Sequence, residues 1–442
     1  MNKLLIFTEQ KSKRLKYIFD LVLTDLMGLE YEITADKESF SNSTLPKFSY
    51  GAEPIGSEIF FEAVSLLFET EIKPQPINFC EHGRLHGFFP VYKTTSSLPF
   101  DLFASAFFMV TRYEEYLPSK LDKYDRYRGS QSMNQKAGFL HKPMVNLYAK
   151  ELQKMFSEKF PSLVYKKTKF EYQATFDIDM AYSYLEKGLR RNLGGFMKSF
   201  FLSDMKDLRK RALVLSGRVK DPFDTYDYIF KVCNENGIPT KFFFLVADES
   251  RFDKNIAPDN PKFIELIQDI SKKTETGIHL SFKSHISSSK SQLEINRLEQ
   301  IIGKRPTINR YHYLRFHVQS SYPRLVKHGM AEDYSLGYAA HSGFRAGMCT
   351  PFYFFNVRTN DQTSLRIFPF TFMDATFTHY YRTNTENSLE KIRQLMKSVH
   401  EVGGTMIGIW HNSSFTEEKE WKGWRSVFET VAYEAAELMK QQ

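Results

Sequence analysis

The sequence of 442 residues holds only three cysteines, Cys80, Cys233 and Cys349. They are odd in number, lie far apart and include no CxxC pair, so the sequence supports neither a disulfide framework nor a thiolate zinc knuckle. Tryptophan is scarce as well, with 3 residues against 41 phenylalanines and 24 tyrosines. We therefore expect a protein of a reducing compartment whose core is filled mainly by Phe and Tyr rings.

Long apolar runs are also missing from the sequence. No stretch approaches the ~20 apolar residues that a membrane-spanning helix needs. The apolar run at residues 4–7 is shorter than the ~7–15 residues at the centre of a secretory signal. We therefore expect a soluble, cytoplasmic protein that is not exported.

A large excess of one charge is absent over most of the chain. The net charge is +8, but acidic residues match the basic ones through most of the sequence, so charge alone predicts no nucleic-acid partner. Residues 186–220 are the exception, with ten Lys or Arg against two Asp and one Glu. A basic amphipathic insert can make peripheral contact with an anionic membrane. A solvated helical hairpin packed on the main domain explains the same pattern, and both interpretations stay open.

Strand and helix signals divide the chain into two parts. Residues 1–165 have the pattern of a smaller α/β domain of unknown role. From residue 166 to residue 442, apolar segments alternate with helical ones, which favours a parallel sheet closed into a barrel or a doubly wound sheet. The seven expected strands are residues 170–176, 241–247, 277–282, 306–316, 333–338, 364–373 and 405–410. In a barrel, the residues at the carboxyl ends of these strands would share one mouth.

Two aspartates follow the first of these strands. Asp177 and Asp179 are separated by one residue, so on a strand both side chains point to the same side. One carboxylate could bind a metal ion while the other acts as a base. Two loop-capping aspartates would give the same pattern, and the place at a strand end favours a functional role.

Further polar residues lie near the ends of other strands. His279 is suited to bind a divalent metal ion. Arg310 could keep a catalytic carboxylate ionised, or it is a solvated arginine beside a strand. His411 could protonate a leaving amine or stabilise an oxyanion. Trp410 could stack on a sugar ring, and core packing explains it equally well.

The order of these residues along the chain resembles the polysaccharide deacetylases of NodB homology, similar to carbohydrate esterase family 4. That resemblance implies a distorted seven-stranded β/α barrel and a divalent metal, usually zinc, that serves to remove acetyl groups from N-acetylated sugars. It implies Asp177 as the base, Asp179 as a metal ligand, His279 as a second ligand and Arg310 and His411 as catalytic residues. The motifs on which the resemblance rests are Thr-Phe-Asp-Ile-Asp at 175–179, Arg-Tyr-His-Tyr at 310–313 and Ile-Trp-His at 409–411.

The resemblance extends to a branch of these proteins with an added N-terminal α/β domain of uncharacterised role. The segments that carry it are residues 99–106, 111–116 and 343–352. Within or beside the motifs, Tyr313, Arg345 and Trp410 are the candidate substrate contacts.

One position departs from the family pattern. The family has a second metal-binding histidine four residues after the first, and this sequence has Lys283 there. A protonated lysine offers no lone pair and repels a divalent ion. We predict that His312, at the proline place of the third motif, replaces the missing ligand, and that His285 does not. A surface or core role for His312 stays open.

These features predict a metal-dependent deacetylase, an amidohydrolase or esterase, that acts on an acetylated oligo- or polysaccharide. Asp177 would accept a proton from water and His411 would protonate the leaving amine. The alternative is a catalytically silent, carbohydrate-binding or scaffold protein with the same fold and no complete metal site.

Overall fold

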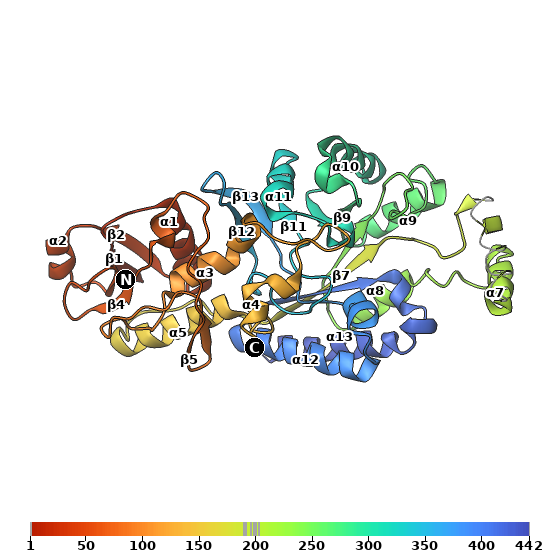
Figure 1. Ribbon diagram of the computed structural model, residues 1–442. Helices are drawn as coiled ribbons and strands as arrows, with labels where there is room; N and C mark the ends of the chain where they lie inside the picture. Colours follow the sequence, from red (N-terminus) through yellow and green to blue (C-terminus); the bar gives the residue numbers. More distant parts are fainter. Residues whose placement is uncertain (1, 189–191, 195–196, 198–200, 202–203, 442) are drawn as a thin grey trace.

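The computed structural model describes residues 2–188, 192–194, 197, 201 and 204–441. A smaller N-terminal part, red to orange in Figure 1, lies beside a larger C-terminal part, and each has its own mainly parallel sheet. The chain is therefore α/β, as the sequence predicts. The boundary between residues 165 and 166 stays a prediction.

The N-terminal part is built on a four-stranded parallel sheet in the order β2-β1-β3-β4. Its elements are β1 (Lys3–Phe7), α1 (Lys13–Phe19), β2 (Glu30–Thr34), α2 (Lys37–Asn42), β3 (Lys47–Gly51), β4 (Ile59–Glu62), α3 (Leu102–Val110) and α5 (Met144–Lys159). Every residue of α3 is buried. The preceding Asp101 caps this helix, because its Oδ1 accepts the N–H of Ala104 at 2.9 Å. A helix that is apolar on all sides thus starts at a single buried carboxylate.

The C-terminal part contains a nine-stranded sheet in the order β12-β13-β11-β10-β9-β8-β7-β15-β14. The strands are β7 (Glu171–Ile178), β8 (Thr240–Phe244), β9 (Glu275–Leu280), β10 (Ile308–Tyr311), β11 (Glu332–Asp333), β12 (Phe352–Asn356), β13 (Asp361–Ile367), β14 (Phe372–Met373) and β15 (Thr405–His411). All neighbours pair in parallel except β12 and β13. Within the described residues, no ladder joins β12 to β14, so a closed seven-stranded barrel is not confirmed.

One difference from the expected strands has a local cause. The segment 364–373 forms two strands instead of one, because Pro369 between them has no N–H for a ladder. β13 then pairs with β11, and β14 pairs with β15 near the other end of the sheet. The antiparallel strand β12 lies where the sequence predicts no strand.

Helices cover the C-terminal sheet, and the residues of each strand alternate between two sets of contacts. The covering helices are α8 (Tyr226–Glu235), α9 (Pro261–Ser271), α10 (Ser288–Ile302), α11 (Val318–Lys327), α12 (Thr385–Val402) and α13 (Trp424–Lys440), whereas α7 (Met205–Leu215) lies away from the sheet (Figure 1). On β15, Ile407 and Ile409 join a small inner cluster, whereas Met406 and Trp410 belong to the main core that includes α13. This alternation decides which residues of a strand can reach the inner side.

A buried ionic network joins the two parts. Arg112 donates its Nε to Glu115 Oε1 at 2.8 Å, and Arg345 donates its Nη2 to Glu115 Oε2 at 2.6 Å. Arg345 also donates to the carbonyl oxygen of Gly337 at 2.7 Å. Arg345 is 3% exposed, so its guanidinium holds the two parts together and does not serve as a substrate contact.

The basic segment 186–220 is only partly described, and Arg190 and Arg191 lie outside the described residues. In α7, Lys210 forms an ion pair with Glu418, and the Arg211 guanidinium lies 4.7 Å from the ring of Tyr184. Among the described residues, no helix is long and apolar enough to cross a membrane. Peripheral membrane contact through this segment stays a prediction.

Candidate active site

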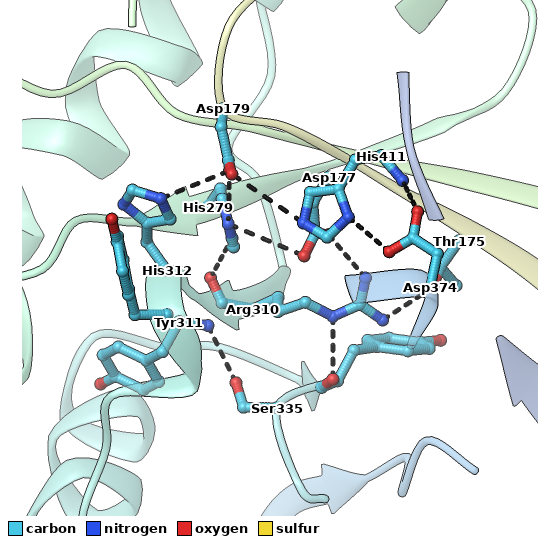
Figure 2. A network of polar contacts seen from close by, with 12 residues as sticks. Thr175, Asp177, Asp179, His279, Arg310, Tyr311, His312, Ser335, Asp374 and His411 are labelled. Carbon is cyan, nitrogen blue, oxygen red and sulfur yellow. Dashed lines mark hydrogen bonds and ion pairs between the residues drawn. The ribbon is translucent and has the colours of Figure 1, made fainter. Parts of the chain in front are cut away.

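Polar residues from four strands, β15, β7, β9 and β10, gather at one edge of the C-terminal sheet (Figure 2). The registers place His411 of β15 opposite Asp177 of β7, and His279 of β9 opposite Arg310 of β10. These strands are parallel, so their carboxyl ends meet at the same edge. Residues that are far apart in the sequence therefore form one site.

Asp179, His279 and His312 lie together and each offers one ligand atom, with these atoms within 4.8 Å of one another. Asp179 Oδ1 is 3.2 Å from His279 Nε2 and 3.5 Å from His312 Nε2. Both histidines are buried. The structure thus places His312 beside Asp179 and His279, and its role as a ligand stays a prediction.

The hydrogen bonds of the two rings determine where their lone pairs point. His279 Nδ1 lies 2.9 Å from the carbonyl oxygen of Arg310, which can only accept, so Nδ1 carries a proton. His312 Nδ1 lies 2.9 Å from Asp253 Oδ1 and donates to that carboxylate. In the singly protonated ring, the lone pair is then on Nε2, which faces Asp179.

One buried oxygen, Asp179 Oδ1, lies at the centre of this arrangement. Asp179 Oδ1 is buried and accepts no hydrogen bond from the described residues. Two imidazole lone pairs and one carboxylate oxygen that converge in this way match the nitrogen and oxygen ligands of zinc. The residues present therefore fit a divalent metal ion.

The charges of the cluster are strongly coupled. Burial lowers the pKa of His312, but Asp179 and Asp253 together raise it to about 9. Burial disfavours the Asp179 carboxylate, yet His312, His279 and His411 hold its pKa well below the usual range. Without a cation the cluster is thus held by an ion pair, and a bound metal ion would displace the proton of His312.

Asp177 lies next to this cluster and is fixed by Arg310. Arg310 Nη1 donates to Asp177 Oδ1 at 2.6 Å, and Nη2 donates to Thr175 Oγ1 at 2.8 Å. The guanidinium is fully buried and also donates its Nε to the carbonyl oxygen of Tyr334. The second carboxylate oxygen, Asp177 Oδ2, is 3.7 Å from His279 Nε2 and faces the cluster.

His411 closes another side of the site. Its Nε2 lies 3.9 Å from Asp179 Oδ2, and its Nδ1 lies 2.7 Å from Asp374 Oδ1. Burial lowers the pKa of His411, but Asp374 first, then Asp179 and Asp177, raise it to about 10. At neutral pH the ring is therefore an imidazolium that can donate a proton from Nε2.

Sequence reasoning missed two carboxylates that orient the histidines. Asp374 is fully buried directly after β14, and it also accepts the backbone N–H of His411 at 2.8 Å. The same signal that selects Asp177, an aspartate at the end of an apolar strand, could have found it. Asp253 lies in the long loop after β8, where no such strand-end signal exists.

The remaining predicted residues divide between the site and the core. Tyr313 is half-buried beside His312, with ring centroids 4.6 Å apart.

Trp410 is completely buried and donates its Nε1 to Tyr172 OH at 2.9 Å, so it cannot stack on a sugar. The alternation along β15 explains this correction, because it turns Trp410 toward α13 and away from the inner side that holds His411. Lys283 is exposed, and His285 lies in a separate cluster.

A family model matches the N-terminal part of the chain. Residues 4–161 match the model of a family of unknown function (DUF7033). No curated protein matches the sequence.

Three solved structures are similar to part of the chain. A protein of Mycobacterium smegmatis assigned as a polysaccharide deacetylase is 14% identical over 60% of this chain and 85% of its own, with a TM-score of 0.39. A Puue allantoinase is 14% identical over 60% and 84%, also with a TM-score of 0.39. A CE4 family pseudoenzyme of Bacillus anthracis is 10% identical over 61% of each chain, with a TM-score of 0.31.

Proposed function

We propose that this protein is a metal-dependent deacetylase that removes an acetyl group from an acetylated carbohydrate. The observation that carries the proposal is the convergence of three buried ligand atoms, Asp179 Oδ1 and the Nε2 atoms of His279 and His312, while both Nδ1 atoms are held by acceptors outside the cluster. Asp177 and His411 stand on two sides of that cluster. The order of the motifs suggests the carbohydrate substrate. As part of the same proposal, the C-terminal part would have the barrel fold of the deacetylases.

Asp179, His279 and His312 would hold the metal ion, with zinc as the first candidate. Three protein ligands would leave one position free for water or substrate, as catalytic zinc sites require. When bound, a divalent ion supplies Lewis acidity that polarises an acetyl carbonyl and lowers the pKa of water.

Asp177 is suited to accept the proton of the attacking water. Arg310 holds one of its oxygens at 2.6 Å, which leaves Oδ2 facing the cluster. Loss of that proton accompanies formation of the new carbon–oxygen bond at the acetyl carbonyl. The products are acetate and a free amine or hydroxyl on the sugar.

His411 is suited to donate the proton that the leaving group needs. Asp374 orients its ring through Nδ1, so the proton on Nε2 points toward Asp179 and the cluster. The imidazolium can also stabilise negative charge on the carbonyl oxygen before the carbon–nitrogen or carbon–oxygen bond breaks. Tyr313, half-buried beside His312, borders the space where a substrate would bind.

Acetate release from a panel of N- and O-acetylated saccharides tests this function, together with the zinc content of the purified protein. We expect one zinc per chain and acetate release that a chelator abolishes. The alternative is a catalytically silent scaffold, which is suggested by Lys283 at the place of the family's second histidine. In that case the protein would bind saccharide but hold no metal and release no acetate.

A further inference from the structure

One loop of the N-terminal part reaches the candidate active site. Residues 118–129 follow α3 and a short 3-10 turn, and this orange segment extends across the C-terminal part (Figure 1). Three consecutive residues of the loop, Tyr124, Asp125 and Arg126, contact the segment that directly follows His312. The N-terminal part therefore borders the cluster that we propose as a metal site.

Arg126 makes the most direct of these contacts. It is 8% exposed, and its Nη1 donates to the carbonyl oxygen of Tyr313 at 3.0 Å. Its Nη2 donates to Tyr380 OH at 3.1 Å, and its Nε donates to Asp122 Oδ2 at 2.8 Å. The guanidinium is thus fixed by its own loop and joins two segments of the C-terminal part.

The turn that Arg126 contacts has an unfavourable backbone conformation. Tyr313 has a φ of 60° and Leu314 a φ of 53°, so two consecutive residues with side chains are left-handed. Such residues persist only where their surroundings hold them in place. His312 directly precedes this pair, so the position of its ring depends on what holds the turn.

The two neighbours of Arg126 hold the next positions of the same segment. The ring centroid of Tyr124 lies 5.4 Å from that of Tyr313. Asp125 Oδ2 accepts from Arg315 Nη2 at 3.1 Å, and the backbone carbonyl of Asp125 accepts from His317 Nε2 at 2.9 Å. The loop therefore contacts three alternate positions after His312.

We propose that residues 122–126 form a positioning loop that holds the turn after His312 and thereby sets the metal affinity of the Asp179–His279–His312 cluster. Asp253 orients the His312 ring, whereas the loop fixes the backbone from which that ring projects. This inference rests on the proposed function for the presence of a metal ion. It gives the N-terminal part a role as a component of the active site.

The test compares Arg126→Gln with the matched control Arg128→Gln. Arg128 belongs to the same loop, is exposed, and donates its Nε to the carbonyl oxygen of Leu121 instead of to the turn. The full-length proteins are titrated with zinc against a competing chelator, and the visible spectrum of the cobalt-loaded protein reports ligand geometry. We expect R126Q to weaken zinc binding by about 10–100-fold, the usual cost of losing support outside the ligand shell, and to change the cobalt spectrum. R128Q should match the wild type in both measurements.

The result that overturns the inference is wild-type zinc affinity and cobalt spectrum in R126Q, or an equal loss in R128Q. If R126Q does not fold, Arg126→Lys serves in its place, because one ammonium group cannot reproduce the three directions of donation and should also weaken zinc binding. A wild-type protein that binds zinc but releases no acetate ends the proposed function and leaves this inference standing. A wild-type protein that binds no zinc ends both.

Discussion

Two clusters, one in the C-terminal part and one between the two parts, have the same composition of one aspartate and two histidines, but they differ in what their Nε2 atoms face. In the first, Asp179, His279 and His312, both Nδ1 atoms donate outward and both Nε2 atoms face the carboxylate. In the second, Asp125, His285 and His317, the Nε2 of His317 donates to the backbone carbonyl of Asp125. A proton thus occupies the place that a metal ligand would need for its lone pair.

The two carboxylates differ as well. Asp179 Oδ1 has no hydrogen-bond donor among the described residues, whereas Asp125 Oδ2 receives Arg315 Nη2 at 3.1 Å. Burial, together with the charges of Arg315 and His317, outweighs the contact with Asp125 and lowers the pKa of His285 to about 4. His285 is therefore neutral and structural. The comparison teaches that residue types at suitable distances do not make a metal site unless their lone pairs converge.

Removal of one ligand from each cluster is the most direct way to break this comparison. We expect His279→Ala and His312→Ala to abolish stoichiometric zinc binding and acetate release, since each removes one of three ligands. His285→Ala, in the second cluster, should leave one zinc per chain. Zinc content measured by mass spectrometry on the purified variants decides between them. Equal zinc loss in the His285 variant would show that the two clusters were assigned wrongly.

The proposed acid and base give the next largest effect. His411→Ala should lower kcat by about 10²–10⁴-fold with little change in zinc content, the usual range for one general acid. Asp177→Asn should likewise remove turnover while zinc stays bound, because the amide keeps the shape and loses the proton acceptor.

Asp179→Asn is the control, since it should lower zinc occupancy instead. The two measurements are steady-state acetate release and zinc content. If Asp177→Asn and Asp179→Asn lose zinc to the same extent, their assigned roles are incorrect.

The sequence predicts the main elements because their signals are local. Parallel strands with apolar residues, the helices between them, and the strand-end positions of Asp177, Asp179, His279 and His411 follow from periodicity alone. The resemblance indicates that a histidine is missing at position 283, and the prediction that His312 replaces it is an inference from the residues of this sequence. The lone-pair directions could not be predicted, because they depend on the backbone carbonyl of Arg310 and on the carboxylate of Asp253.

Contacts between the two parts were equally beyond the sequence analysis. Arg345 is predicted as a substrate contact, but its partner, Glu115, lies 230 residues earlier in the chain. The contact of Arg126 could not be predicted for the same reason, since nothing near residue 126 indicates that the strained turn at Tyr313 lies against it. Long-range pairing of this kind has no periodic signal.

Asp253 sharpens the comparison with a smaller expected effect. It orients the His312 ring through Nδ1 and also accepts the backbone N–H of Phe282 at 2.9 Å. We expect Asp253→Asn to weaken zinc binding by about 10–100-fold, because such partners fix the ring and raise its basicity. Chelator competition measures the affinity. The control is Asp248→Asn. Asp248 is exposed, lies in the same loop after β8 as Asp253, and pairs with Arg297.

The smallest expected effect comes from Arg315→Met, which removes the guanidinium from Asp125. If a free carboxylate beside two histidines were enough, this variant would gain a second zinc site. We expect the stoichiometry to stay at one zinc per chain, because the proton on His317 Nε2 is still held by the backbone carbonyl of Asp125. Calorimetric titration of the variant with zinc counts the sites, and the double variant with His279→Ala removes the first site from the count. A second equivalent bound as tightly as the first would mean that charge, and not the direction of the lone pairs, separates the two clusters.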